Sequence, residues 1–158
     1  MTPPLFDRNN TMIRPLLTLS LAVWAFAAQA QLSPLGLWRS IDDETKQAKA
    51  EIRISLNAAG ALSGVVEKSL VTTPSAEPNC NLCTDDRKDK PKIGMEIIRG
   101  GQQGDGKAVW EGGKILDPEN GKNYSLRLTP IDGGKKLEVR GYIGAPLLGR
   151  TQTWIRVQ

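Results

Sequence analysis

Histidine is absent from the 158-residue sequence, and cysteine and aromatic residues are scarce. Without histidine the chain cannot build a Ser-His-Asp triad, a Cys-His dyad or a histidine-ligated metal site. The net charge of +4 arises from interleaved basic and acidic residues, whereas nucleic-acid-binding proteins gather basic residues on one face. We therefore expect no cofactor, no metal ion and no nucleic-acid partner, and the composition identifies no substrate.

The first thirty residues have the organisation of a secretory signal peptide. Arg14 precedes the apolar stretch 16–28, which ends in the small-residue cleavage pattern Ala28-Gln29-Ala30. This stretch is too short for a transmembrane helix, which needs about 20 apolar residues. The alternative, a buried amphipathic helix, would need a polar face that the stretch lacks. The sequence predicts cleavage near Ala30 and export to the periplasm or the medium.

Beyond residue 31, apolar side chains follow a period of two instead of a helical period. In residues 50–56, 124–128 and 137–143 every second side chain is apolar, the pattern of half-buried antiparallel strands. Further strands are expected at residues 36–40, 62–69, 94–99, 108–111, 114–116 and 151–157. Many short strands in one domain, residues 31–158, predict an all-β fold.

Short turn-forming segments separate these strands. The segments 57–60, 117–121 and 132–134 each contain glycine and are typical of hairpin connections. No long crossover suggests parallel pairing, so successive strands are expected to pair as antiparallel neighbours. A long meander protects its edges by closing on itself, which predicts a single up-and-down antiparallel β-barrel of about eight strands.

The first and last predicted strands resemble the lipocalin pattern. Gly36-Leu37-Trp38 supplies the G-x-W sequence, and Arg150 and Arg156 lie near the end of the chain. In lipocalins a late arginine packs across the tryptophan and closes the barrel base, because a guanidinium stacks well on an indole face. The resemblance implies a structural role for Trp38 with Arg150 against it, and Arg156 is the alternative partner.

A closer resemblance covers nearly all of the chain after the predicted signal peptide. It rests on the runs GLWR at 36–39, DD at 42–43, KPKIGM at 90–95, WEGGKILDP at 110–118, LEVRGY at 137–142 and LLGRTQTW at 147–154. These runs resemble the exported bacterial family called domain of unknown function 2147. The resemblance implies a small lipocalin-like β-barrel in the Gram-negative envelope and no settled activity.

The inward faces of the predicted strands define the candidate pocket, since a small barrel can hold one ligand among apolar side chains. The candidate ligand-binding residues are Met95, Ile97, Arg99, Trp110, Tyr124, Leu126, Leu137 and Val139. On a regular strand Arg99 shares a face with Met95 and Ile97, where it could anchor a ligand carboxylate or pair with Glu111. Core packing is the alternative role for the aromatic residues, which also include Tyr142 and Trp154.

Residues 71–91 form the one long irregular segment, which we interpret as a loop or lid. It contains Cys80 and Cys83 in a C-x-x-C pattern. A zinc site would need two further ligands, and a thioredoxin-like redox pair would need a helix N-terminus for which the sequence gives no signal. An exported protein meets an oxidising environment, which favours a local disulfide between the two cysteines.

Acidic residues raise two further possibilities. Asp85, Asp86 and Asp89 could bind a cation, although they lack the glycine and distal glutamate of a calcium loop and lie in a mixed-charge run typical of a solvated surface. An inward-facing pair of carboxylates would support acid–base catalysis. The candidates for such a pair are Glu51, Glu96, Glu111, Asp117 and Glu138.

Two classes of function follow from the predicted barrel. The first is a non-enzymatic binding protein for a small apolar or amphipathic ligand such as a lipid. The second is a structural or interaction protein of the envelope whose barrel is filled by its own side chains. The volume left inside the barrel distinguishes them, and the sequence does not indicate an oligomeric state.

Overall fold

The structure, a computed structural model, describes residues 32–73, 76–105 and 107–157. The predicted signal peptide, residues 1–30, lies outside the described residues. Among the residues that are described, no helix has the length and apolar character needed to cross a bilayer.

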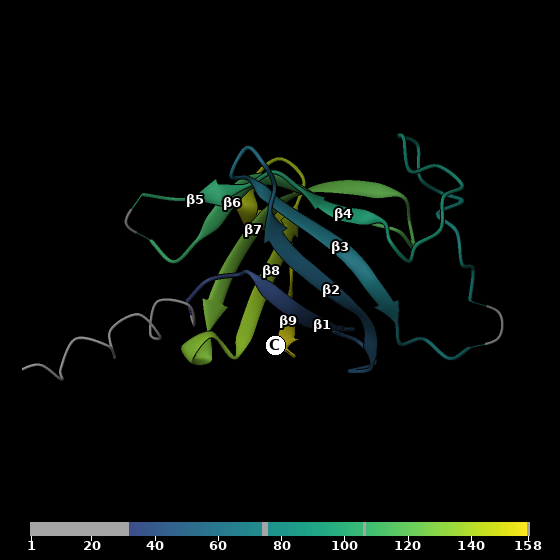
Figure 1. The fold of residues 1–158 in the computed structure, drawn as a ribbon, viewed down its shortest axis with the longest axis horizontal. Helices are drawn as coiled ribbons and strands as arrows, with labels where there is room; N and C mark the ends of the chain where they lie inside the picture. Colours follow the sequence, from purple (N-terminus) through teal and green to yellow (C-terminus); the bar gives the residue numbers. More distant parts are fainter. Residues whose placement is uncertain (1–31, 74–75, 106, 158) are drawn as a thin grey trace, which may run out of the picture.

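The described chain is built of antiparallel strands joined mostly by short turns, with one long connection between β3 and β4 (Figure 1). The strands are β1 (Gly36–Ile41), β2 (Ala48–Leu56), β3 (Leu62–Ser69), β4 (Glu96–Arg99), β5 (Gln102–Gln103), β6 (Trp110–Asp117), β7 (Lys122–Ile131), β8 (Lys136–Tyr142) and β9 (Arg150–Arg156). Two short 3-10 turns, η1 (Asp132–Gly134) and η2 (Pro146–Leu148), connect β7 to β8 and β8 to β9. The two segments predicted at 108–111 and 114–116 form the single strand β6.

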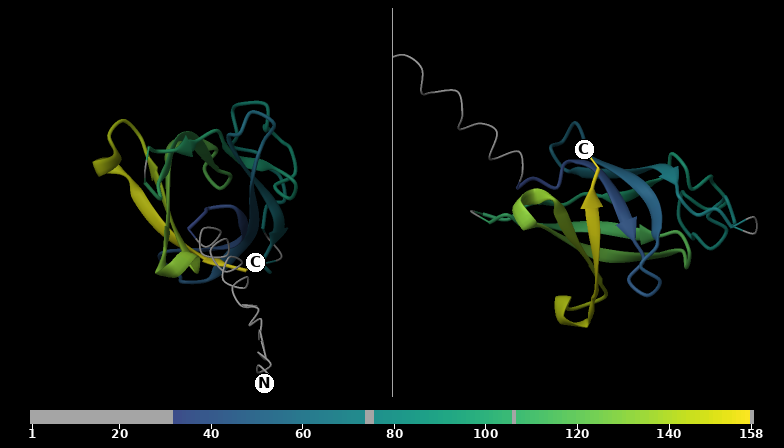
Figure 2. Two further views of the ribbon diagram at one scale, coloured as in Figure 1. Left: turned by 60° about the vertical axis from the view of Figure 1, so that its left-hand side comes forward. Right: turned by 90° about the horizontal axis from the view of Figure 1, so that it is seen from below.

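Strand pairing closes the sheet into a barrel, which the view in Figure 2 shows as a ring of strands. Neighbouring strands in the chain pair in order, except that β4 pairs with β6, and β9 returns to pair with β1. In this last pair Trp38 lies opposite Arg156. The predicted up-and-down antiparallel barrel of eight main strands is therefore confirmed.

Strand β5 continues the path of β4 along β6 after a sharp change of direction at Gly100 and Gly101. Both glycines have positive φ angles, 76° and 100°. The chain passes so close to β6 that a Cβ atom on Gly113 would lie 2.4 Å from the Gly100 carbonyl oxygen. Glycine is required at this crossing because any side chain on Gly113 would push the two strands apart.

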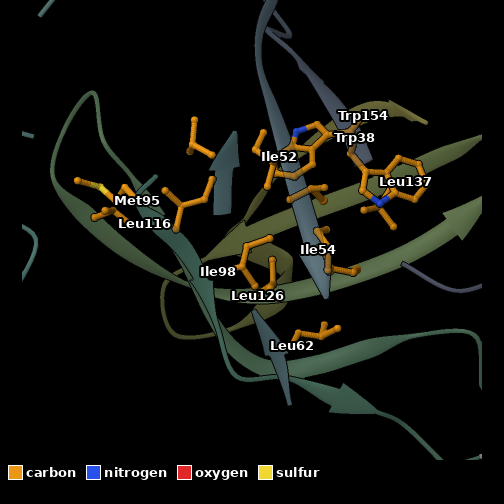
Figure 3. Close-up of a cluster of buried hydrophobic side chains, with 14 of the residues drawn as sticks. Trp38, Ile52, Ile54, Leu62, Met95, Ile98, Leu116, Leu126, Leu137 and Trp154 are labelled. Atoms are coloured by element: carbon orange, nitrogen blue, oxygen red, sulfur yellow. The ribbon is translucent and has the colours of Figure 1, made fainter. Parts of the chain in front are cut away.

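Apolar side chains from all main strands meet in one core (Figure 3). The alternation on β7 and β8 directs Leu126, Leu128 and Leu137 inward, and all three are fully buried. Together with Trp38 and Ile54 they fill one half of the barrel. The other half is not filled, and it contains the site described next.

Candidate functional site

One end of the barrel opens into a cavity of about 600 Å3. The strand ends and connecting segments at residues 42–49, 69–71, 92–93, 117–120 and 143–148 contribute to its lining. Apolar side chains from the strands form the wall, namely Ala50, Ile52, Val66, Ile97, Ile115, Leu116, Val139 and Trp154. A concave, mostly apolar wall with a few polar groups is the usual form of a small-molecule site.

Strand β9 contributes a charged, a polar and an aromatic residue to the cavity lining. Arg150, Gln152 and Trp154 alternate along the strand, and all three line the cavity. The Trp154 indole Nε1–H donates a hydrogen bond of 3.0 Å to the Gln152 side-chain oxygen. The polar N–H of the buried indole therefore has a hydrogen-bond partner, and its apolar rings remain available to contact a ligand.

The opposite end of the barrel is sealed by Trp38. Its indole is fully buried, and its Nε1–H donates to the Pro34 carbonyl oxygen at 2.7 Å. The Arg156 guanidinium lies 4.1 Å from the centre of the Trp38 ring and donates to the carbonyl oxygens of Ser33, Leu35 and Gly134. Burial lowers the pKa of Arg156, and the stacked ring and three carbonyl groups offset the cost of burying its charge.

The sequence-based assignment of Arg150 to this contact is wrong, because Arg156 occupies it. Arg150 lies at the other end of β9, where its Nε–H donates to the Asp43 carboxylate at 2.5 Å. Glu44 approaches the same guanidinium at 3.5 Å. The Arg150 guanidinium lowers the pKa of the Asp43 carboxyl, so this mouth pair is fully ionised at neutral pH.

The β1–β2 connection holds a second ionised carboxylate at the mouth. Asp42 accepts hydrogen bonds from the backbone N–H groups of Glu44 and Thr45 and from the Thr45 hydroxyl. These bonds, chiefly those from Thr45, lower the pKa of Asp42 to about 2. The Lys49 ammonium lies 3.7 Å from the same carboxylate.

Large aliphatic side chains stand exposed around the opening. We call Val71, Ile93, Ile143 and Leu148 the apolar rim, since all four line the cavity and are at least 40% exposed. The Arg140 guanidinium donates to the carbonyl oxygens of residues 146 and 147 and so holds the η2 part of the rim in place. An apolar molecule entering the cavity would contact these side chains first.

The segment predicted as a loop or lid is fastened to the barrel beside the opening. Cys80 and Cys83 form a disulfide and are both fully buried, which confirms their predicted pairing. A Cβ atom on Gly121, in the β6–β7 turn, would lie 1.9 Å from the Leu82 carbonyl oxygen. The disulfide-closed loop therefore packs directly against this turn.

A buried arginine completes the attachment of the loop. Arg87 is only 5% exposed, and its guanidinium donates to the Asp85 carboxylate, to the Glu96 carbonyl oxygen at 2.9 Å and to the Asn123 side-chain oxygen at 2.6 Å. The Arg87 side chain lowers the pKa of Asp85. The loop is thus joined to both β4 and β7, and its continuation carries Lys92 and Ile93 to the cavity.

Comparison with known proteins agrees with this architecture. The family model for an uncharacterized protein conserved in bacteria (DUF2147) matches residues 36–156. The chain belongs to this family. A solved structure of the Helicobacter pylori protein HP1028, described as belonging to the lipocalin family, is similar with a TM-score of 0.65 and 16% identity. The similarity covers 78% of this chain and 82% of that one. This similarity shows that the fold is lipocalin-like. No curated protein gives a significant match.

The cavity of this DUF2147 member includes three of the residues predicted from sequence to bind a ligand. Ile97, Tyr124 and Val139 line it. Four others pack in the buried cluster and are not part of the cavity lining, namely Met95, Trp110, Leu126 and Leu137. Alternation correctly predicted that these four are buried, but it does not distinguish the filled half of the barrel from the open half.

Arg99 lies on the outer surface, contrary to the prediction that it shares a face with Met95 and Ile97. The pairing of β3 with β4 shifts by one residue between Gly64 and Val65, so β4 is not a regular strand. Arg99 donates to the carboxylates of Asp86 and Glu96 at 2.7 and 2.9 Å. Its expected alternative partner, Glu111, pairs with Arg127 instead.

The acidic residues considered as catalytic or cation-binding candidates are not brought together at the cavity. Four of the five carboxylates considered for catalysis, Glu51, Glu96, Glu111 and Glu138, are absent from the cavity lining. Asp117 lines the cavity, but its oxygens accept hydrogen bonds within its own turn. Asp85, Asp86 and Asp89 pair with Arg87, Arg99 and Lys88 respectively. In the part of the chain that is described, no three His, Cys, Asp or Glu side chains converge as metal ligands would.

Several lining residues were not assigned to the pocket from sequence. Ile52 and Val66 lie on the apolar faces of β2 and β3, so their inward direction was predictable from alternation. Gln152 gave no such signal, because a polar residue on β9 is expected to face solvent. Its inward position follows from its phase with Trp154, two residues along the strand.

Proposed function

We propose that the protein binds one small apolar or amphipathic molecule, such as a lipid, inside the barrel. The observation that carries this proposal is the cavity of about 600 Å3, apolar along its wall and open at one end. Small-molecule sites typically have volumes of about 300–1,000 Å3. A protein whose barrel served only as a scaffold would be stabilised by filling this space, because close-packed interiors gain dispersion energy.

The chemistry of the wall supports binding without catalysis. Apolar side chains dominate the strand-borne lining, and Gln152 and Tyr124 add a few polar groups that could orient a ligand. General acid–base catalysis needs carboxyls or other titratable groups within reach of the reacting atoms. The lining carboxylates lie at the mouth, where Asp42 and Glu119 are paired with lysines.

Two observations support a place for this binding protein in the bacterial envelope. The disulfide between Cys80 and Cys83 is a bond that persists in oxidising compartments. The predicted signal peptide, residues 1–30, would direct the chain to such a compartment. We infer that the protein meets its ligand in the periplasm or outside the cell.

Native mass spectrometry of protein purified from the envelope under non-denaturing conditions tests this function. We expect a fraction of the protein to carry an added mass that organic extraction removes, and the extract should contain an apolar or amphipathic molecule. A protein that carries no added mass, and that also fails to bind a neutral apolar dye after extraction, would instead support a structural role.

A further inference from the structure

The cations that line the cavity are all paired with acidic side chains. These cations are Lys49, Lys92 and Arg150. The Lys49 ammonium lies 3.7 Å from Asp42, and the Lys92 ammonium lies 3.1 Å from Glu119. Neither lysine therefore presents an unneutralised positive charge to a ligand that enters the cavity.

Arg150 is the most extensively paired of the three cations. Its guanidinium binds both carboxylate oxygens of Asp43, a bidentate arrangement that fixes the geometry of the pair more closely than a single hydrogen bond would. Glu44 lies 3.5 Å away and adds a second negative charge. A ligand carboxylate that approached this guanidinium would have to compete with Asp43 and Glu44 for its positive charge.

The balance of charge in the lining is negative. Four acidic side chains, Asp42, Glu44, Asp117 and Glu119, line the cavity together with the three basic ones. Asp43, bound to Arg150, adds another acid at the mouth. An anionic head group here would meet these carboxylates, while each cation of the described lining is already paired, and this arrangement of charge is unfavourable for it.

An uncharged polar group has a partner at the same place. Tyr124 lines the cavity, and its hydroxyl accepts a hydrogen bond of 3.1 Å from the Asn120 side-chain amide. Because a phenol can donate as well as accept, its own O–H can be donated to a hydroxyl or carbonyl oxygen of a ligand. This bond would hold the polar end of a ligand near the mouth while its apolar part occupies the barrel.

We propose, on the basis of the function proposed above, that the cavity selects an apolar chain ending in an uncharged hydroxyl, ester or amide and rejects the same chain ending in a carboxylate. The ion pairs around the opening, above all that of Arg150 with Asp43, produce this selection. Asp43 is thus a specificity-determining residue, although it does not itself line the cavity.

Competition between ligands of equal chain length tests the proposal. The full-length mature protein is loaded with the neutral dye N-phenyl-1-naphthylamine at pH 7.5, and the dye is displaced with 1-dodecanol or with dodecanoate. We expect the alcohol to displace the dye at a concentration lower by at least about tenfold, since juxtaposed like charges are strongly unfavourable. Equal or stronger displacement by dodecanoate would overturn the proposal, and this comparison needs no variant.

The Asp43→Asn variant tests the assigned residue. The substitution would release Arg150 from its ion pair with Asp43, so dodecanoate should bind more tightly. The ratio of the dodecanol affinity to the dodecanoate affinity should therefore fall by at least about threefold, which is half of the tenfold effect in free energy. The control is Asp89→Asn, which removes an exposed carboxylate paired with Lys88 in the 80–91 loop. A ratio that changes equally in both variants, or in neither, would contradict the role of Asp43.

The two proposals fail in different ways. If neither the dye nor either chain binds, the proposed function fails and this inference fails with it. If the alcohol and the acid bind equally, only this inference is refuted.

Discussion

At the scale of single residues, the two arginines of β9 occupy opposite chemical environments. Arg156 lies at the sealed end, stacked on Trp38 and bonded to three backbone carbonyl groups. Arg150 lies at the open end with its side chain 57% exposed and paired with Asp43. Arg156 thus closes the barrel base, and Arg150 forms an ion pair at the cavity mouth.

Replacing each arginine by methionine should separate these roles. We expect Arg156→Met to lower the free energy of unfolding by about 2–3 kcal/mol, because it leaves three partly buried carbonyl groups without their donor. Arg150→Met should cost less than about 1 kcal/mol, as is typical of an exposed ion pair. Urea denaturation of both variants measures the difference, and equal losses would contradict the assignment of Arg156 to the barrel base.

The pair of Asp85 with Arg87 should make stability depend on pH. Arg87 lowers the pKa of Asp85 from its ordinary value of 3.8, so this carboxylate stabilises the folded state above that pH. The contribution is lost as the pH falls through the lowered pKa. We expect Asp85→Asn to cost about 1 kcal/mol at pH 7 and the difference from the natural protein to shrink steadily below pH 4. The exposed Asp89→Asn variant should show no comparable loss, and a difference that stays constant between pH 4 and pH 2 would contradict this role.

At the scale of secondary-structure elements, the β6–β7 turn and the disulfide loop are in direct contact. Gly121 has a φ of 71° and lies against the Leu82 carbonyl group. Gly60, in the β2–β3 turn, has a similar φ of 73°, but a Cβ atom added there would meet no other atom within 4 Å. The two glycines have the same backbone requirement, and only Gly121 is sterically confined.

Alanine at these two positions should give different results. Both substitutions carry the cost of a left-handed backbone, about 1 kcal/mol. Gly121→Ala should in addition separate the loop from the turn, so that residues 80–91 become sensitive to limited proteolysis. Gly60→Ala should leave the loop protected. If the loop is equally protected in both variants, the contact with Gly121 does not hold it.

The elements were largely predictable from sequence because antiparallel strands with one buried face show a period of two. The irregularity of β4 was not predictable, since a one-residue shift in pairing has no local sequence signal, and the predicted position of Arg99 was wrong for that reason. The partner of Trp38 could have been chosen correctly. In an antiparallel closure the end of the last strand lies beside the start of the first, which places Arg156, and not Arg150, next to Trp38.

The open half of the barrel was less accessible to sequence reasoning than the filled half. Leu137 and Val139 have the same inward phase on β8, yet of these two Val139 alone lines the cavity. The difference depends on how far each residue lies along the barrel axis, and that is set by the tilt and register of all the strands together. A pattern within one strand does not contain this information.

At the scale of the whole molecule, the barrel combines a sealed end, a filled half and an open half with a charged mouth. The proposed place of this molecule in the envelope depends on cleavage of the predicted signal peptide. N-terminal sequencing of protein recovered from the periplasm should begin at or near Gln31, after the Ala28-Gln29-Ala30 pattern. Recovery of the intact chain from the cytosol would contradict both the export and the proposed location of the ligand.

The most direct test of the account is whether the cavity itself binds an apolar molecule. We expect N-phenyl-1-naphthylamine to bind the extracted protein at one site, with enhanced dye fluorescence and quenching of tryptophan emission, because Trp154 forms part of the wall. Val139→Phe places an aromatic ring in the cavity, narrows it and should weaken this binding several-fold. Thr153→Phe, which adds the same ring to the exposed face of β9, should preserve it. No saturable binding to the folded natural protein, or equal binding by the Val139→Phe variant, would contradict the assignment of the cavity as the functional site.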